Sequence, residues 1–480
     1  MLFSSLQFIL AFLPAFLLLY YLVPHKWKKQ VLLLGSILFY CAGSIYSFGI
    51  YSASIIINFG FNKMLVRNKE IDPQLPQNVL DNLLSKRKRR RASLMVLIVL
   101  WNVCLLGLFK YWSFFAHTVN TVAGIDYLPI LDLKLPLGIS FYTFQVLSYQ
   151  IDCYRETVEK PASLLDFAVY MTMFPQLISG PIVRYTTIAE RLESPGVNLN
   201  GLESGMKNFV LGLGLKVLLA NQIGTLWNSI QISGAESIST PIAWLGAVAY
   251  SMQLYFDFWG YSVMAIGLGQ MIGYKMPQNF KNPYIATSVS DFWRRWHITL
   301  GSWFREYVYF PLGGSRCSKR KMIRNLFLVW ILTGLWHGAG WNFLIWGITL
   351  FTLIAMEKLF LGKVFQRLPI LGHLYVMILM PVTWVVFAIQ ELPVLLQYLG
   401  RMAGYGSCNV AAANQQLLRY LGQYWWLLVL GVFFMTPVPI NFFKEKNRKW
   451  YMMFVMFAIF WFSVYEIYVG KNNPFLYFGF

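Results

Sequence analysis

Two of the five histidines in this sequence lie in apolar, aromatic surroundings, where an imidazole could do chemistry. His337 stands in LTGLWHGAGWNFLIWG at 332–347, and His297 ends the motif DFWRRWH at 291–297. A polar side chain at membrane depth loses its hydration, so its presence there predicts a functional site. Neutral imidazole is a suitable general base near neutral pH. The alternative is a buried imidazole that is bonded to a backbone carbonyl.

The remaining titratable candidates are weaker. His25, His117 and His373 stand near the ends of apolar stretches, where a hydrated imidazole is ordinary. Asp257 is an acid within a long apolar run, which predicts either a proton relay or, more simply, a charge partner for an arginine. The sequence contains no HxxxH or HExxH pair, so no metal site is predicted.

The segment that carries His297 mixes charged, aromatic and apolar residues over 288–316. Its pattern predicts one helix, with Ser288 or Ser290 as the N-cap and Asp291 in the first turn. Trp293 precedes His297 by four residues, so it could pack on the imidazole. Four apolar residues recur at the same interval and would share a face: Phe292, Trp296, Leu300 and Phe304. We expect a cytoplasmic-side or re-entrant helix, and an interfacial amphipathic helix remains the alternative.

The elements that position these residues are membrane helices. The chain has 480 residues, of which 57% are hydrophobic and 12% charged, about half the usual charged share of a soluble domain. Apolar stretches such as 2–23 and 451–469 are long enough to cross a bilayer core of about 30 Å. We predict an all-α polytopic protein of roughly ten to twelve spans. A single domain would cover 1–480, with a motif core at about 135–350 and peripheral spans at about 370–470.

Basic residues gather in the loops between these stretches, although the net charge is +20. Runs such as KRKRRR at 86–91 are typical of cytoplasmic loops that meet anionic lipid, so no nucleic-acid partner is predicted. HKWKK at 25–29 follows the first apolar stretch, which places the N-terminus outside. GLGQMIG at 267–273 has the wrong spacing for a nucleotide loop and predicts close helix packing.

Four motifs occur in a characteristic order: MFPQLISGPIVRY at 173–185, YFDFWGYSVMAIGLG at 255–269, the segment 291–316, and LTGLWHG at 332–338. Together they resemble the membrane-bound O-acyltransferase (MBOAT) family, in its branch of alginate O-acetyltransferases and D-alanyl teichoic-acid transferases. The alginate type is the more similar. The resemblance implies a helical bundle with re-entrant segments and a central funnel. It also implies that His337 is catalytic and that His297 is the second motif histidine. The chain departs from the pattern at Trp259 and Val263, where a serine and an acid would be expected.

The resemblance further implies transfer of an acyl group from a cytoplasmic thioester. The donor would be acetyl-CoA or an acyl-phosphopantetheine carrier protein, acting as a co-substrate with no bound cofactor. His337 would take the proton of the acceptor hydroxyl, while His297 would steer the carbonyl, bond the oxyanion or orient His337. Gly334, Gly338 and Gly340 would allow close approach, and Trp336 and Trp341 would exclude water. The other expected donor or substrate contacts are Arg294, Arg295, Trp296, Arg305, Asn342, Gln176 and Asp257.

The acceptor expected from the resemblance is a cell-surface or extracellular polysaccharide, reached with the help of a partner acyltransferase outside the bacterial plasma membrane. The nearest alternative keeps the chemistry and transfers D-alanine from a carrier protein to teichoic acid. Two alternatives belong to other classes of protein. One is a proton-coupled transporter or flippase, which the lack of a visible internal repeat weakens. The other is a membrane scaffold without catalysis.

Overall fold

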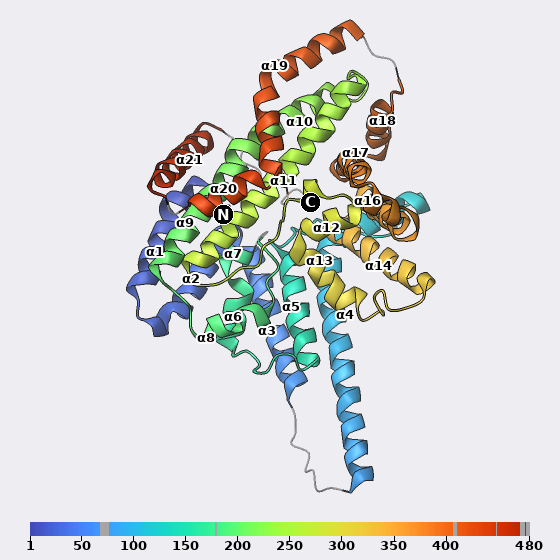
Figure 1. The fold of residues 1–480 in the computed structure, drawn as a ribbon. Helices are drawn as coiled ribbons and strands as arrows, with labels where there is room; N and C mark the ends of the chain where they lie inside the picture. Colours follow the sequence, from blue (N-terminus) through green and yellow to red (C-terminus); the bar gives the residue numbers. More distant parts are fainter. Residues whose placement is uncertain (68–75, 178–179, 407–409, 448, 471–475, 477–480) are drawn as a thin grey trace. The chain divides into compact units, whose positions relative to one another are not determined.

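The computed structural model describes residues 1–67, 76–177, 180–406, 410–447, 449–470 and 476, and within those ranges the chain forms helices and no strand (Figure 1). This confirms the all-α fold class. Among the described residues, six helices are long and apolar enough to cross a membrane, so the chain is a multi-pass membrane protein. They cover 77–123, 199–233, 341–367, 369–388, 411–435 and 450–469. The expected ten to twelve spans stay a prediction.

The chain divides into two compact units, which are described in turn. The first unit comprises residue 1, residues 12–198 and residues 272–275, and the second comprises 2–11, 199–271 and 276–480. The helices of the first unit are α1 (Leu13–Leu22), α2 (Lys28–Cys41), α3 (Ile45–Val66), α4 (Gln77–Ala123), α5 (Ile139–Tyr154), α6 (Leu164–Thr172), α7 (Phe174–Leu177) and α8 (Tyr185–Glu193). The single domain over 1–480 that the sequence suggests stays a prediction.

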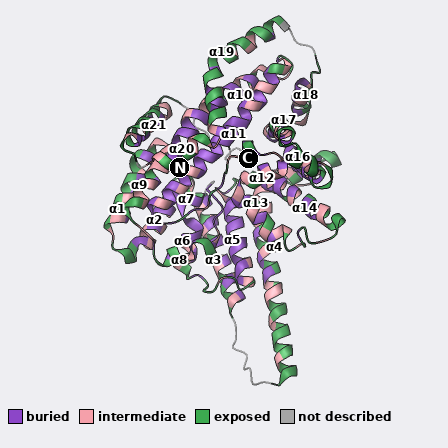
Figure 2. Cartoon of the chain, in the orientation of Figure 1, coloured by how far each residue is buried: buried purple, intermediate pink, exposed green. Residues whose placement is uncertain are grey.

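Buried amides join α3, α4 and α5 in the first unit. The side chains of Asn58 and Asn102 exchange two hydrogen bonds, of 3.1 and 2.8 Å. Gln150 on α5 donates to the carbonyl of Asn58 at 2.8 Å and accepts from Asn62 at 3.1 Å. Figure 2 shows α5 buried along nearly its whole length. Because each of these amides has a partner, the polar side chains cross-link an otherwise apolar interior.

The second unit carries both motif histidines. Its α-helices are α9 (Leu199–Gly214), α10 (Asn221–Ser233), α11 (Thr240–Met271), α12 (Val289–Arg295), α13 (Ile298–Phe304), α14 (Lys319–His337), α15 (Trp341–Met356), α16 (Gly362–Arg367), α17 (Pro369–Ala388), α18 (Leu392–Met402), α19 (Val410–Met435), α20 (Val438–Lys446) and α21 (Trp450–Val469). Shorter turns with other helical hydrogen bonding link them, among them the π-helices η3 (Leu215–Ala220), η5 (Arg305–Tyr309) and η6 (Glu357–Leu361).

Helices α9 and α11 pack at very short range through paired glycines. A Cβ atom built on Gly205 would lie 2.5 Å from the carbonyl oxygen of Gly267, and one built on Gly267 would lie equally close to that of Gly205. Gly212 and Gly260 form a second such pair. Small residues let the two backbones touch, as is common between membrane helices. The prediction that GLGQMIG serves close helix packing is therefore confirmed.

The hairpin of α14 and α15 places His337. A Cβ on Gly347 would lie 2.6 Å from the carbonyl oxygen of Trp330, and one on Gly334 would collide with the carbonyl oxygen of Phe343. A Cβ on Gly338 would overlap the ring of Phe343. Gly334 and Gly338 therefore allow a close approach, as expected, but the approach is between α14 and α15. The space beside these glycines that was expected to admit substrate is filled by atoms of the protein itself.

Candidate active site

The segment around His297 is two short helices instead of one. Helix α12 ends at Arg295, Trp296 is extended, and His297 adopts φ +44° and ψ 54° before α13 begins at Ile298. The prediction of one continuous helix is therefore wrong. Left-handed backbone is unfavourable for residues other than glycine and is concentrated at functional sites, where the surrounding structure enforces it.

The helix break also changes the ring contacts of His297. Phe258 of α11 meets the imidazole edge-on, with ring centroids 4.7 Å apart, and Trp336 of α14 does so at 6.0 Å. Trp293 packs instead against other tryptophans, including Trp346 at 5.5 Å. The expected packing of Trp293 on His297 is therefore replaced by contacts from two other helices.

The first turn of α12 is capped by two acceptors. The hydroxyl oxygen of Ser288 accepts from the backbone N–H of Asp291 at 3.0 Å, which confirms Ser288 as the N-cap. The carboxylate of Glu357, in η6, accepts from the backbone N–H groups of Val289 at 2.5 Å and Ser290 at 2.8 Å. These three N–H groups have no partner within the helix itself, so Glu357 fixes where α12 begins.

A side-chain amide determines the proton position on His297. Nδ1 of His297 lies 3.1 Å from Oδ1 of Asn279, which also accepts from the backbone N–H of Thr299 at 3.3 Å and its hydroxyl at 2.9 Å. Because three donors surround one oxygen, the amide orientation is defined and Nδ1 of His297 carries the hydrogen. Nε2 then has the lone pair, and it has no hydrogen-bond partner among the described residues.

Burial keeps this imidazole neutral. His297 is 2% exposed and lies outside the six helices that could span the membrane. Removal from water disfavours the charged ring and lowers the pKa of His297 from 6.5 to about 3. A neutral ring with its proton on Nδ1 is a proton acceptor at Nε2, so it cannot donate a hydrogen bond to an oxyanion from that atom.

His337 ends α14 inside a cage of aromatic rings. Its ring centroid lies 4.8 Å from that of Trp336, 5.0 Å from Trp346 and 5.1 Å from Phe387, and all three contacts are edge-to-face. Trp336 therefore touches both histidines. Trp341, which was expected to exclude water with Trp336, is 49% exposed, and the tryptophan that contacts His337 beside Trp336 is Trp346.

A cavity of about 460 Å³ opens beside His297. Its wall includes His297, Trp293, Trp296, Arg294, Arg305 and Lys358. The indole N–H of Trp293, like Nε2 of His297, has no hydrogen-bond partner among the described residues. Both of these polar atoms are buried, and the side chains that the cavity wall offers to a ligand are the three cations Arg294, Arg305 and Lys358.

The two predicted arginines of the motif differ in their surroundings. Arg294 is exposed and lies 3.5 Å from the carboxylate of Asp291. Arg295 binds the same carboxylate through Nε at 2.8 Å and lines a different cavity. Of the expected donor contacts, Arg294, Trp296 and Arg305 are therefore gathered at the histidine cavity, and Arg295 is not.

The remaining predicted contacts lie elsewhere. Asn342 is fully buried and donates to the carbonyl of Phe387 at 2.9 Å, so it braces the ring that touches His337. Asp257 forms an ion pair with Lys216, with 2.5 Å between Oδ1 and Nζ, where an arginine was expected. Gln176 belongs to the first unit and donates to the carbonyl of Tyr170.

Sequence reasoning missed Asn279, Glu357, Phe258, Trp346 and Phe387. Glu357 had a usable signal, because it is an acid at the end of a long apolar stretch, which is the feature that singled out Asp257. Asn279 precedes the DFWRRWH motif by more than ten residues, and no spacing rule connects the two. The aromatic residues are too numerous in this chain for any one of them to stand out.

With this geometry established, the chain can be compared with known proteins. Residues 90–400 match the model of MBOAT, the membrane-bound O-acyltransferase family. The chain belongs to this family and is an O-acyltransferase. It is 36% identical over 425 residues to a probable alginate O-acetylase AlgI of Azotobacter vinelandii, covering 88% of this chain and 82% of the relative.

Two further relatives carry other names. A peptidoglycan O-acetyltransferase of Helicobacter pylori is 32% identical over 459 residues, covering 88% of this chain and 84% of the relative. A teichoic acid D-alanyltransferase of Bacillus subtilis is 28% identical over 286 residues, covering 56% of this chain and 70% of the relative. The resemblance seen in the motifs is therefore confirmed at the level of the family.

Proposed function

We propose that this protein transfers an acetyl group from a cytoplasmic thioester across the plasma membrane of a bacterium, toward hydroxyls of a polysaccharide outside it. The observation that carries the proposal is that Trp336 contacts both His297 and His337, with His297 at the wall of a cavity. Relatives named for alginate and peptidoglycan O-acetylation support the acceptor class. The N-terminus would lie outside.

The chemistry is an acyl transfer. The oxygen of the acceptor hydroxyl forms a bond to the thioester carbonyl carbon, the bond from that carbon to sulfur breaks, and the hydroxyl proton passes to the imidazole of His337 and then to the departing thiolate. General-base help of this kind contributes about 10²- to 10⁴-fold. The cage of Trp336, Trp346 and Phe387 keeps water from the thioester.

His297 has a different task in this proposal. Its lone pair at Nε2 accepts a hydrogen bond from an amide N–H of the donor's pantetheine arm and holds the thioester beside Trp336. The buried indole N–H of Trp293, which has no partner among the described residues, would donate to the oxyanion. Three roles were considered for His297. Because its proton is on Nδ1, its Nε2 has no hydrogen to donate, which argues against the role of bonding the oxyanion.

The donor is acetyl-CoA or an acetylated carrier protein. Both carry phosphate, and Arg294, Arg305 and Lys358 at the cavity provide positive charge that attracts it. Either donor is a co-substrate that leaves after each turnover. A partner acyltransferase outside the membrane would complete delivery to the polymer. Transfer of D-alanine is the second candidate, because one relative is named for it.

The test measures acetate and D-alanine released by base from the polymers of cells that lack the native gene. The cells carry wild type, His337→Ala, or His117→Ala at matched membrane abundance. His117 is an exposed histidine on α4 and serves as the matched control. We expect acetate to disappear only with His337→Ala. Loss of D-alanine instead would name the other donor, and full acylation by His337→Ala would favour a transporter or scaffold.

A further inference from the structure

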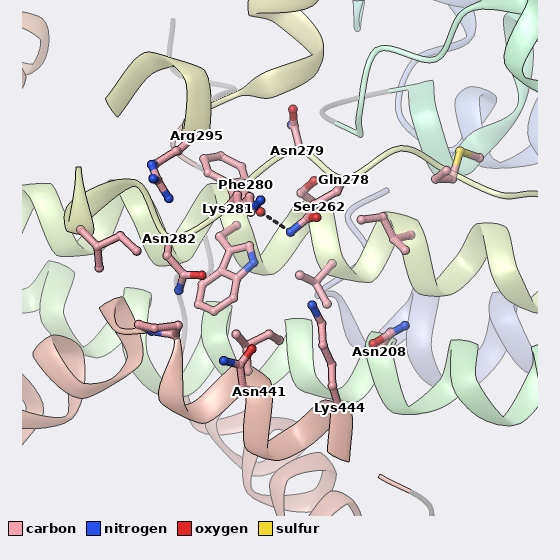
Figure 3. Close-up of a pocket in the computed structure, with 17 residues that line it drawn as sticks. Asn208, Ser262, Gln278, Asn279, Phe280, Lys281, Asn282, Arg295, Asn441 and Lys444 are labelled. Carbon is pink, nitrogen blue, oxygen red and sulfur yellow. Dashed lines mark hydrogen bonds between the residues drawn. The ribbon is translucent and has the colours of Figure 1, made fainter. Parts of the chain in front are cut away.

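A second cavity of the second unit shares no lining residue with the histidine cavity. It measures about 460 Å³ and lies between α11, α20 and the segment 276–282 (Figure 3). We call it the basic pocket, defined by Ser262, Lys281, Asn441 and Lys444. Trp259 and Val263, the two positions at which the motif resemblance led us to expect a serine and an acid, also line it.

The floor of the basic pocket holds an unused polar group. Ser262 is 1% exposed, and its hydroxyl has no hydrogen-bond partner among the described residues. A buried hydroxyl without a partner costs free energy, which a ligand atom at this place would recover. Two neighbouring amides are already held, since Gln278 donates to the carbonyl of Phe280 at 2.6 Å and Asn282 to that of Thr436 at 3.0 Å.

The walls of the pocket carry positive charge that the protein does not neutralise. Figure 3 shows Lys444 and Asn441 reaching from α20 toward the segment that carries Lys281. Neither Lys281 nor Lys444 makes an ion pair with any described residue, and no lining residue is an acid. The third cation, Arg295, is bound through Nε to Asp291, which itself lies outside the lining. Two lysine charges are therefore available to a ligand.

The charge pattern also indicates the side of the membrane. Helix α20 lies between two helices that could span the bilayer, 411–435 and 450–469. The short connection between them carries Lys444, Lys446 and Lys449. Because cytoplasmic loops are enriched in lysine and arginine, this connection and the basic pocket face the cytoplasm.

We propose that the basic pocket binds a phosphate-bearing ligand from the cytoplasmic side, separately from the histidine cavity. A phosphate monoester carries a charge of about −1.5 to −2 at neutral pH and has acceptor oxygens only, which suits two ammonium groups, a hydroxyl and an amide. A carboxylate carries one charge and is best matched by the fork of an arginine, and the one arginine here is already engaged. The phosphate belongs either to a soluble phosphorylated compound or to an anionic phospholipid headgroup.

The test measures binding without catalysis. Full-length protein in phosphatidylcholine nanodiscs is titrated with inorganic pyrophosphate by calorimetry, and D-glucuronate serves as the carboxylate probe. Native mass spectrometry of protein exposed to phosphatidylglycerol measures the lipid source. The variant is Lys281→Gln with Lys444→Gln. The control removes the same charge from the same side of the membrane outside the pocket, as Lys446→Gln with Lys449→Gln.

We expect the pocket variant to lose affinity for one phosphate source by about tenfold or more, while the control variant binds as the wild type does. Loss of pyrophosphate binding identifies a soluble ligand, and loss of phosphatidylglycerol binding identifies a lipid. Equal binding by the pocket and control variants, or glucuronate binding as tight as that of pyrophosphate, overturns the proposal. His337→Ala should bind normally, so the result is independent of acyl transfer.

Discussion

Asn279 accepts a hydrogen bond from His297 across 3.1 Å and thereby decides which ring nitrogen carries the proton. The same asparagine oxygen is held by Thr299, so it cannot turn away without breaking three bonds. His297 therefore lines the cavity as a neutral ring whose lone pair is on the buried Nε2. This is a chemical state set by a neighbouring side chain, and it leads to the first two predictions.

Replacing Asn279 should impair acyl transfer through the histidine. Asn279→Ala removes the acceptor at Nδ1, so the ring can adopt the other tautomer. We expect transfer to slow on the order of 10- to 100-fold, because loss of the hydrogen bond that positions the donor costs about 1–3 kcal/mol. Asn279→Asp retains an acceptor and should recover most of the rate. The measurement is donor consumption by purified protein, with kcat and KM separated. Equal loss in both variants would indicate a purely structural role.

Acid should destabilise the protein through His297. Its pKa is about 3 in the folded chain and 6.5 when exposed, so the unfolded chain binds the extra proton first as pH falls. The stabilisation from the neutral buried ring is complete above pH 6.5 and is lost progressively as pH falls toward 3. His297→Gln removes this dependence. Between about pH 7 and about pH 5, the unfolding temperature should fall further in the wild type than in the variant. Parallel curves would contradict the assignment.

Glu357 should be a positioning residue for His297. Its carboxylate holds the first two backbone N–H groups of α12, eight and seven residues before the histidine. Glu357→Ala should cost about 1.5–3 kcal/mol of stability, the range for hydrogen bonds to a charged group. Glu357→Gln should cost less, because one acceptor oxygen remains. If Glu357 positions His297, kcat should fall by more than the loss of folded protein explains. The melting temperature of each variant measures that loss. Unchanged kcat in Glu357→Ala refutes it.

The ion pair of Lys216 and Asp257 should be structural. Lys216→Met or Asp257→Leu alone leaves one buried charge and should destabilise by about 3–5 kcal/mol. The double variant leaves none and should be closer to wild type than either single change. Denaturation of the three variants forms a double-mutant cycle. If the double variant is stable yet inactive, Asp257 is a relay and the structural interpretation fails.

Trp336 should protect the donor from water. It touches both His297 and His337, so Trp336→Ala opens a space beside each imidazole. We expect hydrolysis of the thioester to rise relative to transfer, because water then reaches the carbonyl. Trp336→Phe keeps an aromatic ring and should preserve most of the ratio. The ratio of free acetate to acetylated acceptor is the quantity to measure, and an unchanged ratio in Trp336→Ala would exclude a sealing role.

The sequence predicted the features that follow from composition and local spacing. The length of the apolar stretches predicted membrane helices. The spacing of GLGQMIG predicted close helix packing, which is the glycine contact between α9 and α11, and Ser288 was one of two predicted N-caps. The break at His297 was not predictable, because the residues around it keep a helical period and only tertiary contacts enforce the left-handed backbone. Asn279 and Phe387 were missed for a related reason, since their contacts with the histidines depend on how distant segments pack.

Glu357 has a consequence for the bilayer itself. It lies within the helix 341–367, whose position along the membrane normal depends on the thickness of the hydrocarbon, and it grips the first turn of α12. A thinner or thicker membrane that shifts this helix would pull on the segment that ends in His297. We therefore expect the acyl-chain length of the host lipid to change the transfer rate of wild type more than that of Glu357→Ala. Turnover in nanodiscs of short- and long-chain phosphatidylcholine would measure how strongly membrane thickness regulates the transfer rate.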